Sequence, residues 1–215
     1  MIARVLDLGH LSYTAALEKQ LEVLEAVQSG HSPHTLIFVE HDPVLTLGAN
    51  FHEENLLLSR EEYARQGIDV QRTDRGGDVT YHGLGQLVIY PIFNVAELGK
   101  DLHKWLRDLE ETMIRTISVL GLGARRFPPH TGVWIDDRKV AAIGIKVKRW
   151  VSLHGIALNC ENDLGVYETI IPCGIKEYGV TTLSGELGRR VQIDEAKPHV
   201  LDAFAEVFSL EFRAA

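Results

Sequence analysis

Hydrophobic residues recur every three or four positions in three segments of the chain, the spacing that is typical of amphipathic helices. The first such segment runs from Ser12 to Gly30, and Gly30 supplies a stop signal. Its apolar face carries Leu17, Leu21, Leu24 and Val27. Between this segment and the next one, Ser59 and Glu62 have the spacing of a capping box, which predicts a short helix from Ser59.

The other two periodic segments each follow an aspartate that can cap a helix. Asp101 precedes the longer one, whose expected apolar face consists of Leu102, Trp105, Leu106, Leu109, Met113, Ile117 and Leu120. Asp194 precedes the last one, which has Pro198 in its predicted first turn and carries Leu201, Phe204, Val207 and Phe208.

The remaining apolar runs are short and rich in β-branched residues, as strands are. They comprise Thr35–Glu40, Val44–Gly48, Ile68–Thr73, Gln86–Ile92 and the stretch from Gly132 to Cys160, which has a predicted turn at Asp136–Asp137. Strands and helices do not alternate strictly. The pattern therefore predicts an α+β fold with a mostly mixed or antiparallel sheet flanked by helices, in a single domain over residues 1–215.

Composition narrows the class of protein. The 215 residues are 45% hydrophobic and 24% charged, which suits one globular core, and the formal net charge of −8 argues against a general nucleic-acid binder. No stretch approaches the roughly 18 apolar residues of a membrane span, and Met1–His10 does not resemble a signal peptide. Two cysteines do not make a disulfide framework, so we expect a reducing cytoplasm.

The segment Arg75–Gln86, "RGGDVTYHGLGQ", is the most unusual loop in the sequence. Its glycines would let the backbone approach a ligand, although a glycine-rich hairpin without a ligand is equally consistent. The Gly-Lys-Ser/Thr ending of a Walker A loop is missing. The apolar runs Ala141–Lys146 and Leu153–Asn159 each contain a glycine, which indicates either a bulge or a pocket floored by small residues, suited to an acyl chain.

The two cysteines differ in setting. Cys160 ends an apolar run, so we interpret it as structural, whereas Cys173 lies between Pro172 and Gly174, where a turn is expected. A thiol has a pKa of about 8.5 and needs a base or a cation nearby to become a nucleophile. Most lone cysteines are simply buried, so the sequence leaves this role open.

Candidate partners for such a thiol are His82, His130 and His154, which are all expected near turns, and Lys139. In a regular strand Lys139 would share a face with Ala141 and Ile143, where desolvation could make it a base. It could equally lie at a hairpin rim with its ammonium in water.

No metal-binding set stands out, because the histidines are scattered and neither CxxC nor HExxH occurs. We interpret His41 as a structural or pocket-rim residue.

Taken together and in order, several motifs resemble the octanoyltransferases of bacterial lipoate biosynthesis, from about His10 to the last helix. These motifs are "EHDPVLTLG", "RGGDVTYHGLGQLVIYPI", "TGVW", "KVAAIGIKV", "HGIALN" and "IIPCGI…VTTL". The resemblance implies the fold of biotin and lipoate protein ligases. It also implies a cysteine/lysine pair, with Cys173 as the acyl-thioester nucleophile and Lys139 as the acid and base.

By the same resemblance, the substrate-binding residues are Arg75, Gly76, Gly77, Asp78, Val79, Thr80, Tyr81, His82, Ala142, Ile143, Gly144, Gly155, Ile156 and Ala157. Two residues depart from the family pattern: Asp78 replaces a glutamine-like residue and Cys160 replaces an aliphatic one. Neither departure affects Cys173 or Lys139.

The implied reaction moves octanoate from acyl carrier protein to the target lysine of lipoyl domains, in 2-oxoacid dehydrogenase E2 subunits and in the glycine cleavage H protein. It needs no ATP and no cofactor, and it would be run by a cytoplasmic monomer without a membrane or nucleic-acid partner. Acyl carrier proteins are acidic, so a local basic patch could steer docking despite the net charge. Candidates for that patch are Lys146, Lys148, Arg149, Arg125–Arg126 and Arg189–Arg190.

Four alternatives remain. An ATP-dependent lipoate or biotin ligase would need an adenylate site, and neither a biotin-ligase loop nor a domain after the last helix is expected. An enzyme moving octanoyl groups between carrier proteins would also use a cysteine. A non-catalytic binding protein would not need Cys173 and Lys139. A redox-sensing thiol would need a resolving partner, which the spacing does not supply.

Overall fold

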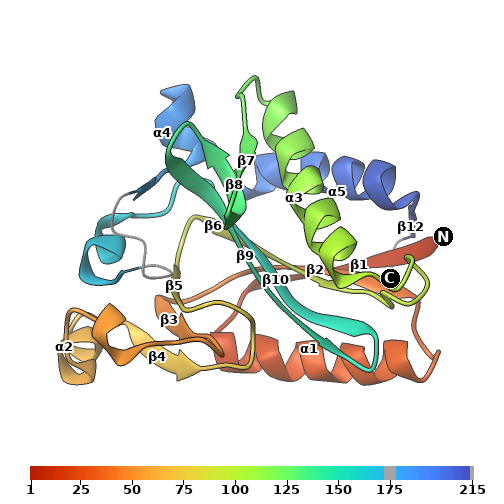
Figure 1. The fold of residues 1–215 in the computed structure, drawn as a ribbon, viewed down its shortest axis with the longest axis horizontal. Helices are drawn as coiled ribbons and strands as arrows, with labels where there is room; N and C mark the ends of the chain where they lie inside the picture. Colours follow the sequence, from red (N-terminus) through yellow and green to blue (C-terminus); the bar gives the residue numbers. More distant parts are fainter. Residues whose placement is uncertain (172–177, 214–215) are drawn as a thin grey trace.

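A computed structural model describes residues 1–171 and 178–213 of the chain. A mixed sheet runs through the molecule in the order β12-β1-β2-β6-β10-β9-β8-β7, and β11 pairs with β9 (Figure 1). Its strands are β1 Ile2–His10, β2 His34–Glu40, β6 Gln86–Ile92, β7 Arg125–Phe127, β8 His130–Ile135, β9 Arg138–Lys148, β10 Val151–Asn159, β11 Gly179–Val180 and β12 Glu211–Arg213. The pairs β12–β1, β1–β2 and β11–β9 are parallel and the other pairs of this sheet are antiparallel. The sheet is therefore mixed, as predicted from the sequence.

Helices cover both faces of this sheet. Helix α1 (Tyr13–Gln28) lies on one face, and α3 (Leu102–Val119) and α5 (Ile193–Phe208) lie on the other (Figure 1). Each face therefore has its own hydrophobic core. The predicted cap of α3 is confirmed, because Asp101 accepts two hydrogen bonds from the first turn of that helix. Ser12, at the predicted start of the first helix, accepts a hydrogen bond from the Ala15 amide and is the N-cap of α1.

A second, smaller sheet packs beside the first. It has the order β4-β3-β5, with β3 Val44–Leu47, β4 Asp69–Arg72 and β5 Val79–His82. Helix α2 (Arg60–Arg65) begins with the predicted capping box of Ser59 and Glu62. The short helices η1 (Glu53–Asn55), η2 (Gly165–Thr169) and α4 (Leu183–Leu187) complete the fold. Strand β5 corrects the prediction that Arg75–Gln86 is all loop, because the middle third of this segment, Val79–His82, pairs with β3.

The last helix begins earlier than predicted. Gln192 is the N-cap, so Asp194 lies in the first turn, where its carboxylate accepts a hydrogen bond from Lys197 at 2.7 Å. Pro198 consequently lies inside the helix and not in its first turn. In α3, Leu102 is 46% exposed and does not belong to the predicted apolar face, because it occupies the first helical position next to the cap. Among the described residues, no helix combines the length and apolar composition that crossing a membrane requires.

Candidate active site

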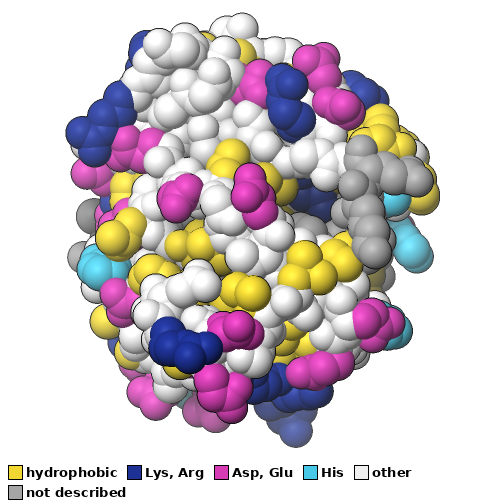
Figure 2. All heavy atoms as spheres, turned by 90° about the vertical axis from the view of Figure 1, so that its left-hand side faces the viewer, with side chains coloured by type: hydrophobic (Ala, Val, Ile, Leu, Met, Phe, Trp, Pro, Cys, Tyr) yellow, Lys and Arg dark blue, Asp and Glu magenta, His cyan; other side chains and the backbone are white. Residues whose placement is uncertain are grey.

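An open cavity of about 420 Å³ lies along β9 and β10, beneath the glycine-rich loop and beside the start of α1. Figure 2 shows the corresponding face, with hydrophobic side chains gathered across its middle and a basic side chain visible inside a hollow. The figure also shows acidic side chains around this face. Most of the residues predicted to bind substrate line the cavity: Arg75, Gly76, Gly77, Val79, Thr80, His82, Ala142, Ile143, Gly144, Gly155, Ile156 and Ala157, together with Lys139.

Two of the predicted binding residues do not line the cavity. Asp78 is buried, and its carboxylate accepts hydrogen bonds from the Asn55 amide group at 2.5 Å and from the Val79 backbone at 2.7 Å. Tyr81 packs edge-on against Tyr167, at 5.9 Å between ring centroids, within the core of the smaller sheet. Their side chains therefore contact neighbouring elements of the fold and hold β5 in place.

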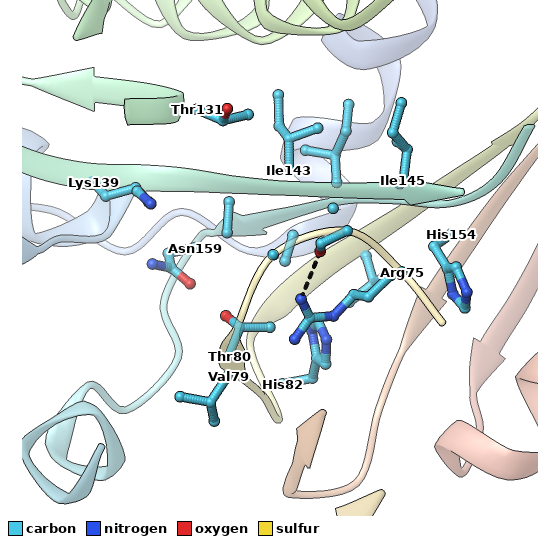
Figure 3. Close-up of a pocket in the computed structure, with 18 of the residues that line it drawn as sticks. Arg75, Val79, Thr80, His82, Thr131, Lys139, Ile143, Ile145, His154 and Asn159 are labelled. Atoms are coloured by element: carbon cyan, nitrogen blue, oxygen red, sulfur yellow. Dashed lines mark hydrogen bonds between the residues drawn. The ribbon is translucent and has the colours of Figure 1, made fainter. Parts of the chain in front are cut away.

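The glycine-rich loop is fixed to the edge of β9 by its own backbone and by Arg75. The Gly76 amide donates to the Ile145 carbonyl at 2.8 Å. The buried Arg75 guanidinium donates to the Gly76 carbonyl at 3.0 Å (Figure 3) and to the Asp78 carbonyl at 2.7 Å. The Gly76 N–H is thus already used by the Ile145 carbonyl.

Gly144 allows this loop to approach the strand. A Cβ atom at this position would lie 2.9 Å from the Gly76 carbonyl oxygen and 3.1 Å from Arg75 Cδ. We expect Gly144→Ala to lower the free energy of unfolding by about 1–3 kcal/mol and to raise the KM for the substrate that occupies the cavity, because the loop must move off β9. Urea unfolding and steady-state kinetics measure the two effects. Gly123→Ala is the matched control, since its Cβ would meet nothing within 4 Å; equal stability of the two variants would contradict the prediction.

Lys139 reaches the cavity because β9 contains a bulge. Trp134 pairs with Lys139 and Val133 pairs with Ala141, so Val140 is an extra residue on β9. Val140 and Ala141 are both fully buried in the core, and Figure 3 shows Lys139 and Ile143 pointing to opposite sides of the strand. The prediction that Lys139 shares a face with Ala141 and Ile143 is therefore wrong: the extra residue reverses the alternation.

The neighbours of Lys139 come from two further strands, β8 and β11. Its ammonium nitrogen lies 4.9 Å from the centroid of the Trp134 ring, a favourable cation–π contact. Gly132, at φ 118°, leaves room for its aliphatic stem. On the other side, β11 pairs with β9, and the Thr181 amide donates to the Lys139 carbonyl at 3.0 Å.

The predicted nucleophile, Cys173, belongs to residues 172–177 and lies outside the described residues. The chain on either side of that segment is anchored near the cavity. The Ile171 amide donates to the Asn55 carbonyl at 2.9 Å. Tyr178 lines the cavity and packs edge-on against Trp134, at 5.9 Å between ring centroids. Tyr178, which follows that segment, is thus in contact with the surroundings of Lys139.

Cys160 is fully buried in the main core. Burial raises the pKa of its thiol to about 12, so the thiolate is not populated at neutral pH. Its interpretation as a structural residue is confirmed.

The candidate histidines all line the cavity, but they lie in different settings. His130 opens β8, and His82 ends β5. The sequence predicts His154 near a turn, but the residue lies in the middle of β10, with φ 60°. His41 is fully buried and bonded to the Leu11 carbonyl and the Tyr90 hydroxyl, both at 2.8 Å, which makes it structural. No His, Cys, Asp or Glu cluster in the described ranges could hold a metal ion.

Buried histidines make the stability of the fold depend on pH. Burial lowers the pKa of His82 to about 3 and that of His41 to about 4, from 6.5. Below about pH 6.5 the unfolded chain takes up these protons while the folded chain does not, so stability falls as pH falls, by about 1.4 kcal/mol per pH unit for each histidine.

We therefore expect urea unfolding between pH 7 and pH 4.5 to give a shallower decline for His41→Gln than for the natural chain. The difference should approach one histidine's contribution, about 1.4 kcal/mol per pH unit. His103→Gln, which removes an exposed histidine of α3, is the matched control. A slope unaffected by His41→Gln would show that this histidine is protonated in the folded state.

Several cavity residues were not singled out from the sequence: Tyr13, Tyr90, Trp134, Asn159 and Tyr178. Asn159 joins two elements, because its amide accepts from Gln86 at 2.9 Å and donates to the Thr181 carbonyl at 3.0 Å. A polar residue at the end of an apolar strand was a usable signal for Asn159. The aromatic residues have no feature in the sequence that marks them as cavity residues, since aromatic side chains in helices and strands usually belong to the hydrophobic core.

The sequence matches the family described as "Lipoyl protein ligase A/B catalytic domain" over residues 12–205. This chain belongs to that family. Curated relatives within it are named octanoyltransferases, which confirms the resemblance found in the motifs. The one from Caldanaerobacter subterraneus subsp. tengcongensis is 41% identical over 208 residues, covering 97% of this chain and 91% of the relative. That from Alkaliphilus metalliredigens is 43% identical over 212 residues, covering 98% and 97%.

Solved structures of the family and its neighbours share the fold. A lipoate-protein ligase A bound with ATP superimposes with a TM-score of 0.85 at 20% identity, over 100% of this chain and 89% of the other. A biotin protein ligase from Aquifex aeolicus gives a TM-score of 0.57 at 16% identity, over 97% and 70%. At these identities the likeness shows the fold alone, and it confirms the predicted α+β architecture.

Proposed function

We propose that this chain is an octanoyltransferase that moves an octanoyl group from acyl carrier protein to the target lysine of a lipoyl domain. The observation that carries the proposal is the cavity along β9 and β10, which has apolar and glycine residues of these strands in its wall and Lys139 at one end. The curated relatives, at 41–44% identity over nearly the whole chain, bear the name of this activity.

The first half-reaction would form a thioester on Cys173. Lys139 takes the thiol proton, and the thiolate attacks the carbonyl carbon of the octanoyl thioester. The tetrahedral oxyanion collapses, the bond to the phosphopantetheine sulfur breaks, and the Lys139 ammonium returns its proton to that departing thiolate. The acyl chain then lies in the apolar part of the cavity, and the carrier leaves with a free thiol.

The second half-reaction would deliver the acyl group to an amine. The lysine of the lipoyl domain loses a proton to Lys139 and attacks the Cys173 thioester. The C–S bond breaks, an amide forms, and the proton on Lys139 passes to the Cys173 thiolate. Because a thioester is converted to a more stable amide, no ATP is consumed and the kinetics are ping-pong.

An ATP-dependent ligase remains the alternative that an observation favours, because a lipoate-protein ligase bound with ATP shares the fold. A ligase would have to activate a free acid, whereas a transferase would use a thioester as its acyl donor. The two proposals therefore differ in their substrate, and a single experiment separates them.

The test mixes the protein with octanoyl-acyl carrier protein, without ATP, and records the intact mass before and after a lipoyl domain is added. We expect one octanoyl adduct on the protein, followed by its transfer to the lipoyl domain. A parallel sample contains free octanoate, ATP and the lipoyl domain. Modification in that sample alone, with no adduct from the thioester, would replace the transferase by a ligase.

A further inference from the structure

Strand β8 is irregular on both of the edges by which it pairs with its neighbours. The bulge at Val140 interrupts its pairing with β9. On the other edge, Phe127 of β7 pairs with His130. Arg125 pairs with Trp134, so two steps along β7 face four steps along β8. Irregular pairing of this kind often redirects a side chain next to a functional site.

Gly132 lies at the centre of this stretch of β8 and has no register partner on β7 or β9. Its φ of 118° belongs to the region that favours glycine, and a Cβ atom there would lie 2.7 Å from the Ala141 carbonyl oxygen. The same atom would lie 3.4 Å from Cδ and Cε of Lys139. The Gly132 backbone is therefore packed beside the stem of the lysine, and its placement affects where the lysine can lie.

A buried carboxylate on α3 holds this backbone in place. Glu110 is 0% exposed, and its Oε1 atom accepts a hydrogen bond from the Gly132 N–H at 3.2 Å. Its Oε2 atom accepts from Arg107 at 2.6 Å and from Nε of Arg126 at 3.1 Å. Arg126 lies between the two paired residues of β7. One carboxylate therefore binds β7 and β8 at the positions where their pairing is irregular.

The bonds that Glu110 makes differ in how easily water could replace them. The bond to Gly132 is buried. The side chains of Arg107 and Arg126 are 51% and 33% exposed, so water reaches both of them. Ion pairs of exposed arginines contribute little, whereas a buried N–H that loses its acceptor is costly. The bond to Gly132 is thus the one that the fold cannot readily replace.

The bulge decides which way Lys139 points. A shift of one residue in strand pairing reverses the faces of the side chains. With regular pairing, Lys139 would point to the same side of β9 as Ile143, whereas Figure 3 shows the two on opposite sides. An interaction that holds β8 in its irregular pairing therefore keeps the lysine in the cavity.

We propose that Glu110 is a positioning residue for Lys139: by binding the Gly132 N–H, it holds the irregular pairing of β8 that directs the lysine into the cavity. Glu110 does not line the cavity, so it acts through Lys139 and not on the acyl group. The part that Lys139 plays as acid and base rests on the proposed function. The direction of its side chain does not, because that direction is a property of the fold.

Two conservative variants separate the bond to Gly132 from the charge of the carboxylate. Glu110→Asp keeps the charge, but its side chain is shorter by one C–C bond, about 1.5 Å, so it no longer reaches Gly132. Glu110→Gln removes the charge but keeps an oxygen at the same distance from α3. That oxygen stays on Gly132, because Arg107 and Arg126 can turn to water.

The experiment measures single-turnover acylation by octanoyl-acyl carrier protein over a range of donor concentrations. We expect Glu110→Asp to lower the maximal rate on the order of 10²-fold, with little change in the donor concentration at half-maximal rate, because a small displacement of a catalytic group has an effect of this size. Glu110→Gln should stay within about threefold of the natural chain. In a Lys139→Met background, Glu110→Asp should change the remaining rate by less than about twofold, because the residue that it positions is gone.

The neighbouring Glu111 provides the matched control. Its carboxylate accepts from Arg115 at 3.2 Å and from Arg126 at 2.9 Å, and its side chain is 32% exposed. In the described part of the chain it bonds to no backbone group of β8. Glu111→Asp and Glu111→Gln should therefore both be acylated at the rate of the natural chain.

A Glu110→Gln variant as slow as Glu110→Asp would show that the charge matters and not the bond to Gly132, which overturns the proposal. A natural rate in Glu110→Asp overturns it as well. So does a loss in Glu110→Asp that multiplies the loss in Lys139→Met, since the effect would then not pass through the lysine. If Glu110→Asp does not fold, the rate of Glu110→Gln decides alone.

If the natural chain transfers no octanoyl group, the proposed function fails, and the positioning role is then decided by the crystal structure of Glu110→Asp. We expect the pairing of β8 with β9 to change at Val140 and Lys139 to leave the cavity. An unchanged bulge with Lys139 still in the cavity would overturn the positioning role, whatever reaction the protein performs.

Discussion

Replacing Cys173 by alanine is expected to abolish the octanoyl adduct and to reduce transfer to the lipoyl domain by on the order of 10³-fold or more, because the acyl group then has no nucleophile. Both half-reactions should be lost together, since the thioester is made in the first and consumed in the second. Intact mass and the rate of lipoyl-domain octanoylation measure the two effects. The prediction rests on the sequence, because Cys173 lies outside the described residues.

Cys160→Ala is the matched control for this prediction. Both cysteines are replaced by the same residue, but Cys160 is fully buried and its pKa is raised to about 12, so it is not available as a thiolate. We expect Cys160→Ala to keep the adduct and to cost only stability, through the small cavity it leaves in the core. An adduct that persists in Cys173→Ala and vanishes in Cys160→Ala would reverse the assignment.

The helices and most strands were predictable because each has a local signal. Ser12, Asp101 and the pair Ser59–Glu62 are caps whose side chains act within one turn of their own position. The one misplaced cap, Asp194, shows the limit of that reasoning. An acidic residue is favourable both as a cap and in the first turn, so the two positions cannot be told apart from residue type.

The site was only partly predictable, because its geometry depends on pairing between distant strands. The motifs identified Lys139 and the loop that includes Gly76, yet the direction of Lys139 depends on a bulge that exists only where β9 meets β8. The backbone bond from Gly76 to Ile145 likewise joins segments about seventy residues apart. Tyr13 reaches the same cavity from the start of α1. Such contacts leave no periodic trace in the sequence.

Lys139→Met is expected to slow both half-reactions by on the order of 10³-fold while preserving the fold, because methionine keeps much of the unbranched stem and removes the amine. The stem lies in space that Gly132 leaves open, so the change creates little strain. Single-turnover acylation by octanoyl-acyl carrier protein and the subsequent transfer step measure the halves separately. Lys197→Met is the matched control, a lysine-to-methionine change on α5 at a residue paired with Asp7 and Asp194.

Lys139→Arg distinguishes the two ways in which this lysine could act. An arginine keeps the positive charge that stabilises a thiolate but does not give up its proton at neutral pH. If Lys139 acts as a base, Lys139→Arg will be as slow as Lys139→Met in the second half-reaction, where a proton must leave the attacking amine. If it acts only as a cation, Lys139→Arg will retain most of the alkylation rate of Cys173 by iodoacetamide and most of the activity. Full activity in Lys139→Met would exclude both roles and would leave the Trp134 contact as a purely structural one.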